Sequence, residues 1–234
     1  MSSVTQEYLD LYNKLEHAIK EMYDVPEGIG PIAWLAREER GFRGIRKELD
    51  YCREVRNLLQ HSERVNGEYA VVPSQGMLKL LSETFAKVAN VPRAIDLCVR
   101  AESVFTACME DPIRPAMREM ADKGYTHVPI LEDGRVVGAF SENTLLTYMN
   151  SGELVEIGED DTFGKMGDLL PLDSHESETF GFVSRDEVAP SIAELFQSAW
   201  KKKKRLGMLF VTANGKQSER MLGVLTSWDL AAFF

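Results

Sequence analysis

The sequence predicts an α+β protein in which a four-helix bundle is followed by an α/β module made of two repeats. Apolar residues recur at helical spacing through residues 1–93. Two similar stretches, residues 138–145 and 223–230, each run from an apolar strand into a hydroxyl residue and then a short amphipathic helix. The breaker Asn90-Val91-Pro92 separates the two patterns. We therefore predict a helical domain over residues 1–93 and an α/β module over residues 94–234, divided into 94–152 and 153–234.

Composition narrows the functions that each half can serve. Of 27 basic and 37 acidic residues, 13 and 14 lie in residues 1–93, which leaves 14 and 23 in residues 94–234. The repeat half carries a charge of −9 and repels polyanions, so we expect any RNA contact at the helical half. No apolar run approaches the roughly 20 residues of a membrane span, and the N-terminus lacks signal-peptide features. We predict a cytoplasmic protein without membrane contact.

Cysteine usage gives no sign of a metal site. Cys52, Cys98 and Cys108 are odd in number, lie among apolar residues and lack a Cys-x-x-Cys spacing. We predict free thiols and no bound metal.

The helical half contains four helical segments with short connections. They cover residues 6–23 after a Thr5 cap signal, a shorter stretch from Pro31 to near Gly41, a long one from Gly44 to near His61, and a last one after the cap Ser74. Asn66-Gly67 is expected to form a turn. Short connections between helices predict an antiparallel bundle.

The two repeats share one pattern of elements. In the first, a strand over residues 126–131 passes through the turn 132–135 into a strand over 136–140. In the second, a strand over 205–211 reaches a strand over 221–225 across a longer polar turn. A helix precedes each hairpin. Ser141 and Thr226 then occupy N-cap positions, with Thr144 and Asp229 at the third helical position.

This repeat resembles the CBS repeat, named after cystathionine beta-synthase, and the tandem pair resembles a Bateman module. Gly223, Thr226 and Asp229 match the family's signature Gly-h-h-Thr-x-x-Asp. The resemblance implies a regulatory adenine nucleotide (AMP, ADP, ATP or a related ligand) whose ribose hydroxyls bind Asp229 and whose phosphate Thr226 helps to hold. A helix N-terminus favours a phosphate. The alternative is that Thr226 and Asp229 form only a capping box.

The resemblance implies further nucleotide contacts. In the family, a basic residue before the strand that normally contains Pro reaches the nucleotide phosphates, and here these positions are held by His127 and Arg205. Residues at strand starts line the base pocket, and here they are Ser103, Val104, Phe105, Thr179 and Phe180. Ser141 is the first repeat's counterpart of Thr226. Arg205 ends the basic run from Lys201 to Lys204, which is either a phosphate-attracting cluster or a solvated helix end.

Two departures from the family pattern bear on the number of sites. Thr144 replaces the ribose-binding Asp in the first repeat, and Gly207 replaces the Pro of the second repeat's strand. The first site is then empty, altered in specificity or structural, whereas the change at Gly207 removes no ligand group. We predict one nucleotide, bound at Asp229.

The end of the third helical segment resembles the Arg-x4-His motif of HEPN domains (higher eukaryotes and prokaryotes nucleotide-binding). Arg56, Asn57 and His61 occupy the matching positions. The resemblance implies that Arg and His from two protomers meet and cleave RNA without a metal. His61 is suited to proton transfer and Arg56 to stabilising charge on a phosphate, while Asn57 lies one turn before His61 and can orient it. The bland alternative is that His61 caps the helix C-terminus.

Helical geometry places a condition on this second site. Five residues at about 100° each put Arg56 about 140° round the helix from His61. Either the helix tightens at His61 or a two-fold dimer supplies the partner, and we favour the dimer. Two functions remain open: a nucleotide-sensing CBS pair that controls a metal-independent endoribonuclease, or a non-catalytic regulatory and dimerisation protein that acts through a partner.

Overall fold

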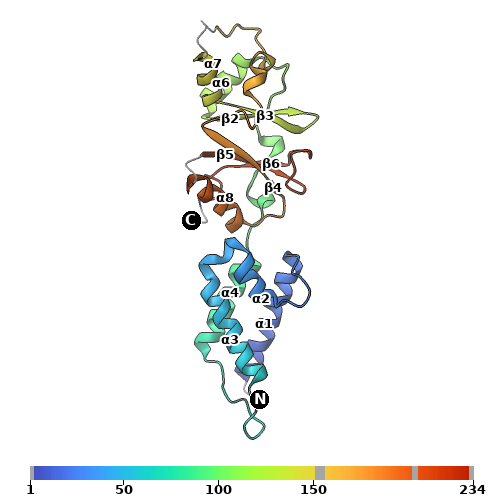
Figure 1. Ribbon diagram of the computed structural model, residues 1–234, viewed down its shortest axis with the longest axis vertical. Coiled ribbons are helices and arrows are strands. Elements are labelled where there is room, and N and C mark those ends of the chain that lie inside the picture. The colour runs from blue at the N-terminus through green and yellow to red at the C-terminus, as the bar shows by residue number, and fades with distance from the viewer. Residues whose placement is uncertain (1–2, 151–155, 202–204, 232–234) are drawn as a thin grey trace. The chain divides into compact units, whose positions relative to one another are not determined.

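The structure is a computed structural model that describes residues 3–150, 156–201 and 205–231. It divides into two compact units, residues 1–92 and 93–234 (Figure 1). The N-terminal unit is helical, and the C-terminal unit mixes strands with helices.

Four α-helices are described in the N-terminal unit. They are α1 (Ser3–Met22), α2 (Pro31–Glu38), α3 (Arg46–His61) and α4 (Gln75–Ala89), with the 3-10 helix η1 (Arg40–Ile45) leading into α3. Helix α1 packs against α2 and α4, and α3 also packs against α2 and α4. This arrangement is the predicted four-helix bundle, but nothing in it identifies a HEPN domain.

The bundle core follows from the apolar faces of these helices. Tyr8, Leu49 and Leu81 are fully buried, and the Tyr8 hydroxyl donates a hydrogen bond to the Cys52 carbonyl at 2.9 Å. Ser74 caps α4 by accepting from the Met77 N–H at 3.2 Å, which confirms that cap. The predicted Thr5 cap is wrong, because α1 already begins at Ser3 and Thr5 is buried within it.

The C-terminal unit contains the two predicted repeats. The first comprises α6 (Ile113–Lys123), β2 (His127–Glu132), β3 (Arg135–Ser141) and α7 (Glu142–Met149). The second comprises β4 (Glu178–Ser184), α8 (Ala189–Lys201), β5 (Arg205–Thr212) and β6 (Gly223–Leu225). Short elements precede them: α5 (Ala94–Leu97), β1 (Val99–Arg100) and η2 (Ala101–Ser103) before the first repeat, and η3 (Phe163–Leu169) before the second.

The strands form two sheets, seen in Figure 1. β2 and β3 make the predicted antiparallel hairpin, whose turn has Asp133 and Gly134 in the left-handed region. The other sheet has the order β1-β6-β5-β4, in which β5 runs antiparallel to β6 and parallel to β4. Its edge strand β1 comes from the segment before the first repeat, so the two repeats are interlocked.

Each repeat has a glycine at the first position of the shared pattern, and close packing explains why. A side-chain carbon added to Gly138 would lie 2.5 Å from the Leu170 carbonyl oxygen, and one added to Gly223 would lie 2.5 Å from the Val99 carbonyl oxygen. In both repeats a neighbouring segment therefore approaches the strand too closely for any other residue.

The repeats differ after their last strand. Ser141 caps α7, as predicted, whereas residues 227–230 form consecutive turns instead of the predicted helix. A further finding concerns membranes: none of the described helices has the length and apolar character needed to cross a bilayer.

Candidate functional site

The Thr226-to-Asp229 stretch folds into a small loop closed by its own carboxylate. Asp229 Oδ2 accepts from the Thr226 backbone N–H at 2.7 Å and from the Thr226 hydroxyl at 2.8 Å. Asp229 Oδ1 receives no hydrogen bond from the residues that the structure describes. The stretch thus realises half of a capping box and leaves one carboxylate oxygen for another donor.

A pocket of about 280 Å³ lies over this loop and is built by both repeats. The start of β2 and the segment before the first repeat supply one wall, and β5, β6 and the loop after β6 supply the other. Its lining residues are Val99, Ser103, Val104, Phe105, Gly124, Tyr125, Thr126, His127, Met208, Val224, Thr226, Trp228 and Asp229. We call this the Asp229 pocket.

Two aromatic residues of the Asp229 pocket were missed by sequence reasoning. Trp228 is 86% exposed, and Tyr125 is also exposed. A large aromatic ring held in water at the edge of a polar pocket offers a flat surface on which a planar ring can stack. The sequence did contain one sign of this role, because Trp228 lies between the two motif residues Thr226 and Asp229.

The structure brings together five of the nine predicted nucleotide-binding residues. Thr226, Asp229, His127, Ser103 and Val104 all line the Asp229 pocket, together with Phe105. These residues come from three separate segments, so their convergence depends on the interlocked fold.

The other four predicted residues do not line the Asp229 pocket. Thr179 lines a separate hollow against α8, and its hydroxyl donates to the Arg205 carbonyl at 3.3 Å. The Phe180 ring stacks on Phe210. Ser141 is buried, and Arg205 begins β5, where it pairs with Glu178. Most of the adjoining lysine run, residues 202–204, lies outside the described residues.

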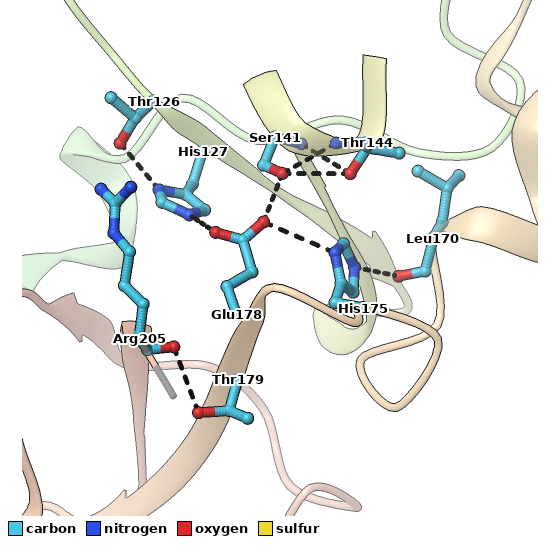
Figure 2. A network of polar contacts seen from close by, with 9 residues as sticks. All are labelled: Thr126, His127, Ser141, Thr144, Leu170, His175, Glu178, Thr179 and Arg205. Atoms are coloured by element: carbon cyan, nitrogen blue, oxygen red, sulfur yellow. Dashed lines mark hydrogen bonds and ion pairs between the residues drawn. The ribbon is translucent and has the colours of Figure 1, made fainter. Parts of the chain in front are cut away.

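At the first repeat, the position equivalent to Thr226 is filled by a buried polar cluster (Figure 2). Ser141 and Thr144 form a full capping box, with the Thr144 N–H donating to Ser141 Oγ at 3.2 Å and the Ser141 N–H donating to Thr144 Oγ1 at 3.1 Å. The Ser141 hydroxyl then donates to Glu178 Oε1 at 2.5 Å. Glu178 belongs to β4, so its carboxylate joins the second repeat to the first.

Two histidines complete this Glu178 cluster. His127 Nε2 lies 2.8 Å from Glu178 Oε2, while Thr126 Oγ1 lies 2.7 Å from His127 Nδ1. His175 Nδ1 lies 3.6 Å from Glu178 Oε1, and its Nε2 faces the Leu170 carbonyl at 3.4 Å. The side chains of Glu178, His127 and His175 are 0%, 5% and 4% exposed. The cluster is therefore closed to solvent.

The Glu178 carboxylate is held in its charged form. Burial alone would raise the pKa of Glu178, but the hydrogen bonds from His127, His175 and Ser141 outweigh burial and hold that pKa far below its ordinary value. Within the described ranges, no three His, Cys, Asp or Glu side chains gather in a way that could hold a metal ion. The cluster is a hydrogen-bonded network around one carboxylate, and it spans the two repeats.

In the helical unit, the structure does not bring Arg56 and His61 together within one chain. Helix α3 remains α-helical through His61, so the less favoured alternative, a tightened helix end, is not seen. Arg56 Nη1 donates to Asn57 Oδ1 at 3.3 Å, and its guanidinium carbon lies 5.6 Å from the centre of the Tyr12 ring. His61 is exposed at the helix end, and no hydrogen bond joins it to Arg56 or Asn57 in the part of the chain that the structure describes.

Comparison with known proteins identifies the C-terminal unit. Residues 96–151 match the CBS domain family. The second repeat has the same order of helix, hairpin and capped loop, with the same close glycine contact, so residues 93–234 form a CBS domain pair, or Bateman module. No curated protein sequence matches the chain.

Solved structures of CBS proteins are similar at low identity. A protein from Vibrio cholerae described as an acetoin utilization protein (AcuB) is 19% identical, with a TM-score of 0.44 over 61% of this chain and 90% of that one. The CBS domain pair of protein MJ0100, in complex with 5-methylthioadenosine and S-adenosyl-L-methionine, is 15% identical, with a TM-score of 0.42 over 62% and 96%. CBSX2 in complex with AMP is 18% identical, with a TM-score of 0.43 over 60% and 94%.

Proposed function

We propose that this chain is a regulatory protein whose CBS pair binds one adenosine-containing ligand in the Asp229 pocket. The observation that carries the proposal is the convergence of Thr226, Asp229 and His127 with the exposed ring of Trp228 in one pocket. Adenine nucleotides and S-adenosylmethionine share the adenosine group, and the chemistry of the pocket matches that group.

Each part of adenosine has a suitable partner. The free Oδ1 of Asp229 can accept from a ribose hydroxyl, since only Oδ2 is used within the loop. The Trp228 ring can stack on the adenine base, a contact worth about 1–3 kcal/mol. The volume of about 280 Å³ is close to the lower end of ordinary ligand pockets and suits a nucleoside with its phosphate outside.

Calorimetric titration of the full chain with AMP, ADP, ATP and S-adenosylmethionine tests the proposal. We expect one ligand per chain and a roughly fivefold to hundredfold loss of affinity in Trp228→Ala, from the lost stacking. Trp200→Ala is the matched control, because Trp200 is exposed on α8 and does not line the pocket. Equal losses in the two variants, or no binding by wild type, would contradict this assignment.

We also propose a homodimer. Tyr51 and Leu58 on α3 are more than half exposed, and they share one helix face with His61 because they precede it by ten and three residues. Leu146 and Met149 on α7 and Leu195 on α8 are exposed as well. Apolar helix faces of this kind favour a partner. Light scattering at micromolar concentration should give twice the monomer mass, and a monomer would contradict the proposal.

A metal-independent endoribonuclease in the helical unit is a second candidate. Its support is the geometry of Arg56: Asn57 and Tyr12 contact the guanidinium, yet its buried Nε has no hydrogen-bond partner among the residues that the structure describes. A phosphate could satisfy that donor, and the exposed His61 of a second copy would be the proton-transfer group.

RNA cleavage in EDTA separates this candidate from a non-catalytic regulator. We expect wild type to cut mixed RNA and Arg56→Ala and His61→Ala to be inactive, while His17→Ala, which alters an exposed histidine of α1, stays active. Cleavage that persists in both site variants would remove the assignment. No cleavage by wild type, with or without nucleotide, would leave the regulatory and dimerisation function.

A further inference from the structure

The pseudo-symmetry of the CBS pair assigns Glu178 to a position already described at the other site. In the first repeat Ile130 pairs with Gly138, and in the second repeat Val211 pairs with Gly223. This register makes Ser141 the counterpart of Thr226, because each lies three residues after its glycine. Glu178, which contacts Ser141, therefore occupies the place that the Asp229 pocket takes beside Thr226.

The two corresponding sites are occupied differently. Phe105 stands in the wall of the Asp229 pocket, whose centre is open. Glu178 extends into the corresponding place of the first repeat, where its two oxygens reach Ser141 and His127. Ser141 is the counterpart of Thr226, so each N-cap hydroxyl donates to a carboxylate: Thr226 to Asp229 of its own loop, and Ser141 to Glu178 of the other repeat.

Gly207 provides the space for this arrangement. A side-chain carbon added there would lie 2.8 Å from His127 Nε2 and 3.4 Å from Glu178 Oε2. A larger residue at this position would push the imidazole away from the carboxylate. The unusual glycine and the buried Glu178 are therefore parts of one feature.

We propose that Glu178 is an internal ligand of the first repeat's site. Its carboxylate fills the place opposite Ser141, closes that site to solutes and fixes the ring of His127. Because His127 also lines the Asp229 pocket, Glu178 acts as a positioning residue for the ligand bound there. This last effect rests on the proposed function, whereas the filling of the first site does not.

Chemical rescue of Glu178→Ala in the full chain tests the internal ligand. The substitution removes one methylene carbon, the carboxyl carbon and two oxygens, and acetate has the same four heavy atoms. We expect Glu178→Ala to unfold at a lower temperature than wild type in sodium chloride, and sodium acetate of equal ionic strength at pH 7 to recover part of the loss with a saturable dose dependence. Wild type should respond equally to the two salts.

Glu176→Ala is the matched control, because Glu176 is an exposed carboxylate two residues earlier on the same loop. It should unfold like wild type and show no preference for acetate. Equal responses of Glu178→Ala to acetate and chloride would overturn the proposal. If Glu178→Ala does not fold in chloride, recovery of folded protein by acetate supports the proposal, and failure of both salts overturns it.

The positioning effect has its own readout, the affinity for AMP by calorimetry. We expect a loss of about fivefold in a folded Glu178→Ala, equivalent to one hydrogen bond, and recovery in acetate. Glu178→Gln keeps the side-chain volume and an oxygen for His127, so its affinity should lie near that of wild type. Equal affinities in all three proteins would overturn the link to His127. Absence of AMP binding by wild type would instead contradict the proposed function, and the thermal test would still decide whether Glu178 is an internal ligand.

Discussion

The two repeats of the CBS pair have the same framework, but the site of one is open and the site of the other is closed. Both use a glycine pressed against a neighbouring carbonyl and an N-cap hydroxyl that donates to a carboxylate. In the second repeat, Asp229 supplies the carboxylate from the same loop, and the pocket above it is open. In the first repeat, Glu178 supplies it from the other repeat, and the site is closed.

This difference separates two tasks that one sequence pattern can perform. A carboxylate within its own loop orders only that loop and leaves an oxygen for a ligand. A carboxylate from the other repeat uses both oxygens in hydrogen bonds within the chain and so connects the two repeats. We infer that the first repeat stabilises the pair while the second binds the ligand, and the following predictions test that division.

The largest expected effect is on stability, and it should be confined to the first repeat's site. Glu178→Ala leaves His127, His175 and Ser141 without their shared acceptor, so we expect a loss of about 3–5 kcal/mol in the free energy of unfolding of the C-terminal unit. Asp229→Ala removes only a cap and should cost about 1 kcal/mol. Urea unfolding followed by circular dichroism measures both, and equal losses would contradict the division.

Ligand affinity should show the opposite preference. Asp229→Ala removes a charged acceptor from the open pocket, so we expect affinity for AMP to fall by about 1.5–3 kcal/mol, or roughly tenfold to over a hundredfold. Thr144→Ala should change affinity little, because Thr144 is buried in the capping box of α7. Calorimetry that finds the larger loss in Thr144→Ala would reverse the roles of the two repeats.

A third test probes the space that glycine leaves for the Glu178 cluster. Gly207→Ala forces His127 from its partner, and overpacking of this kind costs about 1–3 kcal/mol of stability. Gly181→Ala is the control on the neighbouring strand, since its added carbon meets only the end of the flexible Leu209 side chain. If urea unfolding finds Gly207→Ala as stable as Gly181→Ala, the ring of His127 is not constrained as described.

The smallest effect concerns acid. The pKa of Glu178 lies below its ordinary value of 4.5 in the folded chain, so the unfolded chain takes up a proton first. The stabilisation from Glu178 is therefore complete above about pH 5 and is lost as pH falls below 4.5. One pH unit below that value the loss is about 1.4 kcal/mol. Subtracting the unfolding curve of Glu178→Gln isolates this contribution, and parallel pH profiles for the two proteins would contradict it.

Sequence reasoning predicted most of the fold because its signals are local. Ser74 and Ser141 indicate helix starts because their own side chains accept the capping hydrogen bonds. Asp133-Gly134 indicates a hairpin because both residues adopt the left-handed backbone conformation of a tight turn. After Thr226, residues 227–230 form consecutive turns, and the end of the expected helix lies outside the described residues. A capping box looks alike whether it opens a helix or closes a short loop, because both use the same hydrogen bonds.

The candidate site was predictable only where a motif carries it. Thr226 and Asp229 could be found from their spacing, and His127 from its place before a strand. Glu178 could not, because its partners Ser141 and His127 are 37 and 51 residues away in the sequence. Trp228 was missed because exposure of an aromatic ring is a property of the folded surface. Arg205 and Thr179 were expected at the nucleotide site but do not line the Asp229 pocket, and this separation is not visible in the sequence of either repeat alone.

The pairing of β1 with β6 also determines when the chain can complete its folding. Val99 pairs with Val224, so the edge of the larger sheet closes across 125 residues. During synthesis β1 must therefore stay unpaired until β6 has left the ribosome. Contacts of such long sequence separation slow folding and expose unpaired strands. Loss of β6 would leave the larger sheet without the strand that joins β1 to β5, which makes this CBS pair a single folding unit that is complete only once β6 is made.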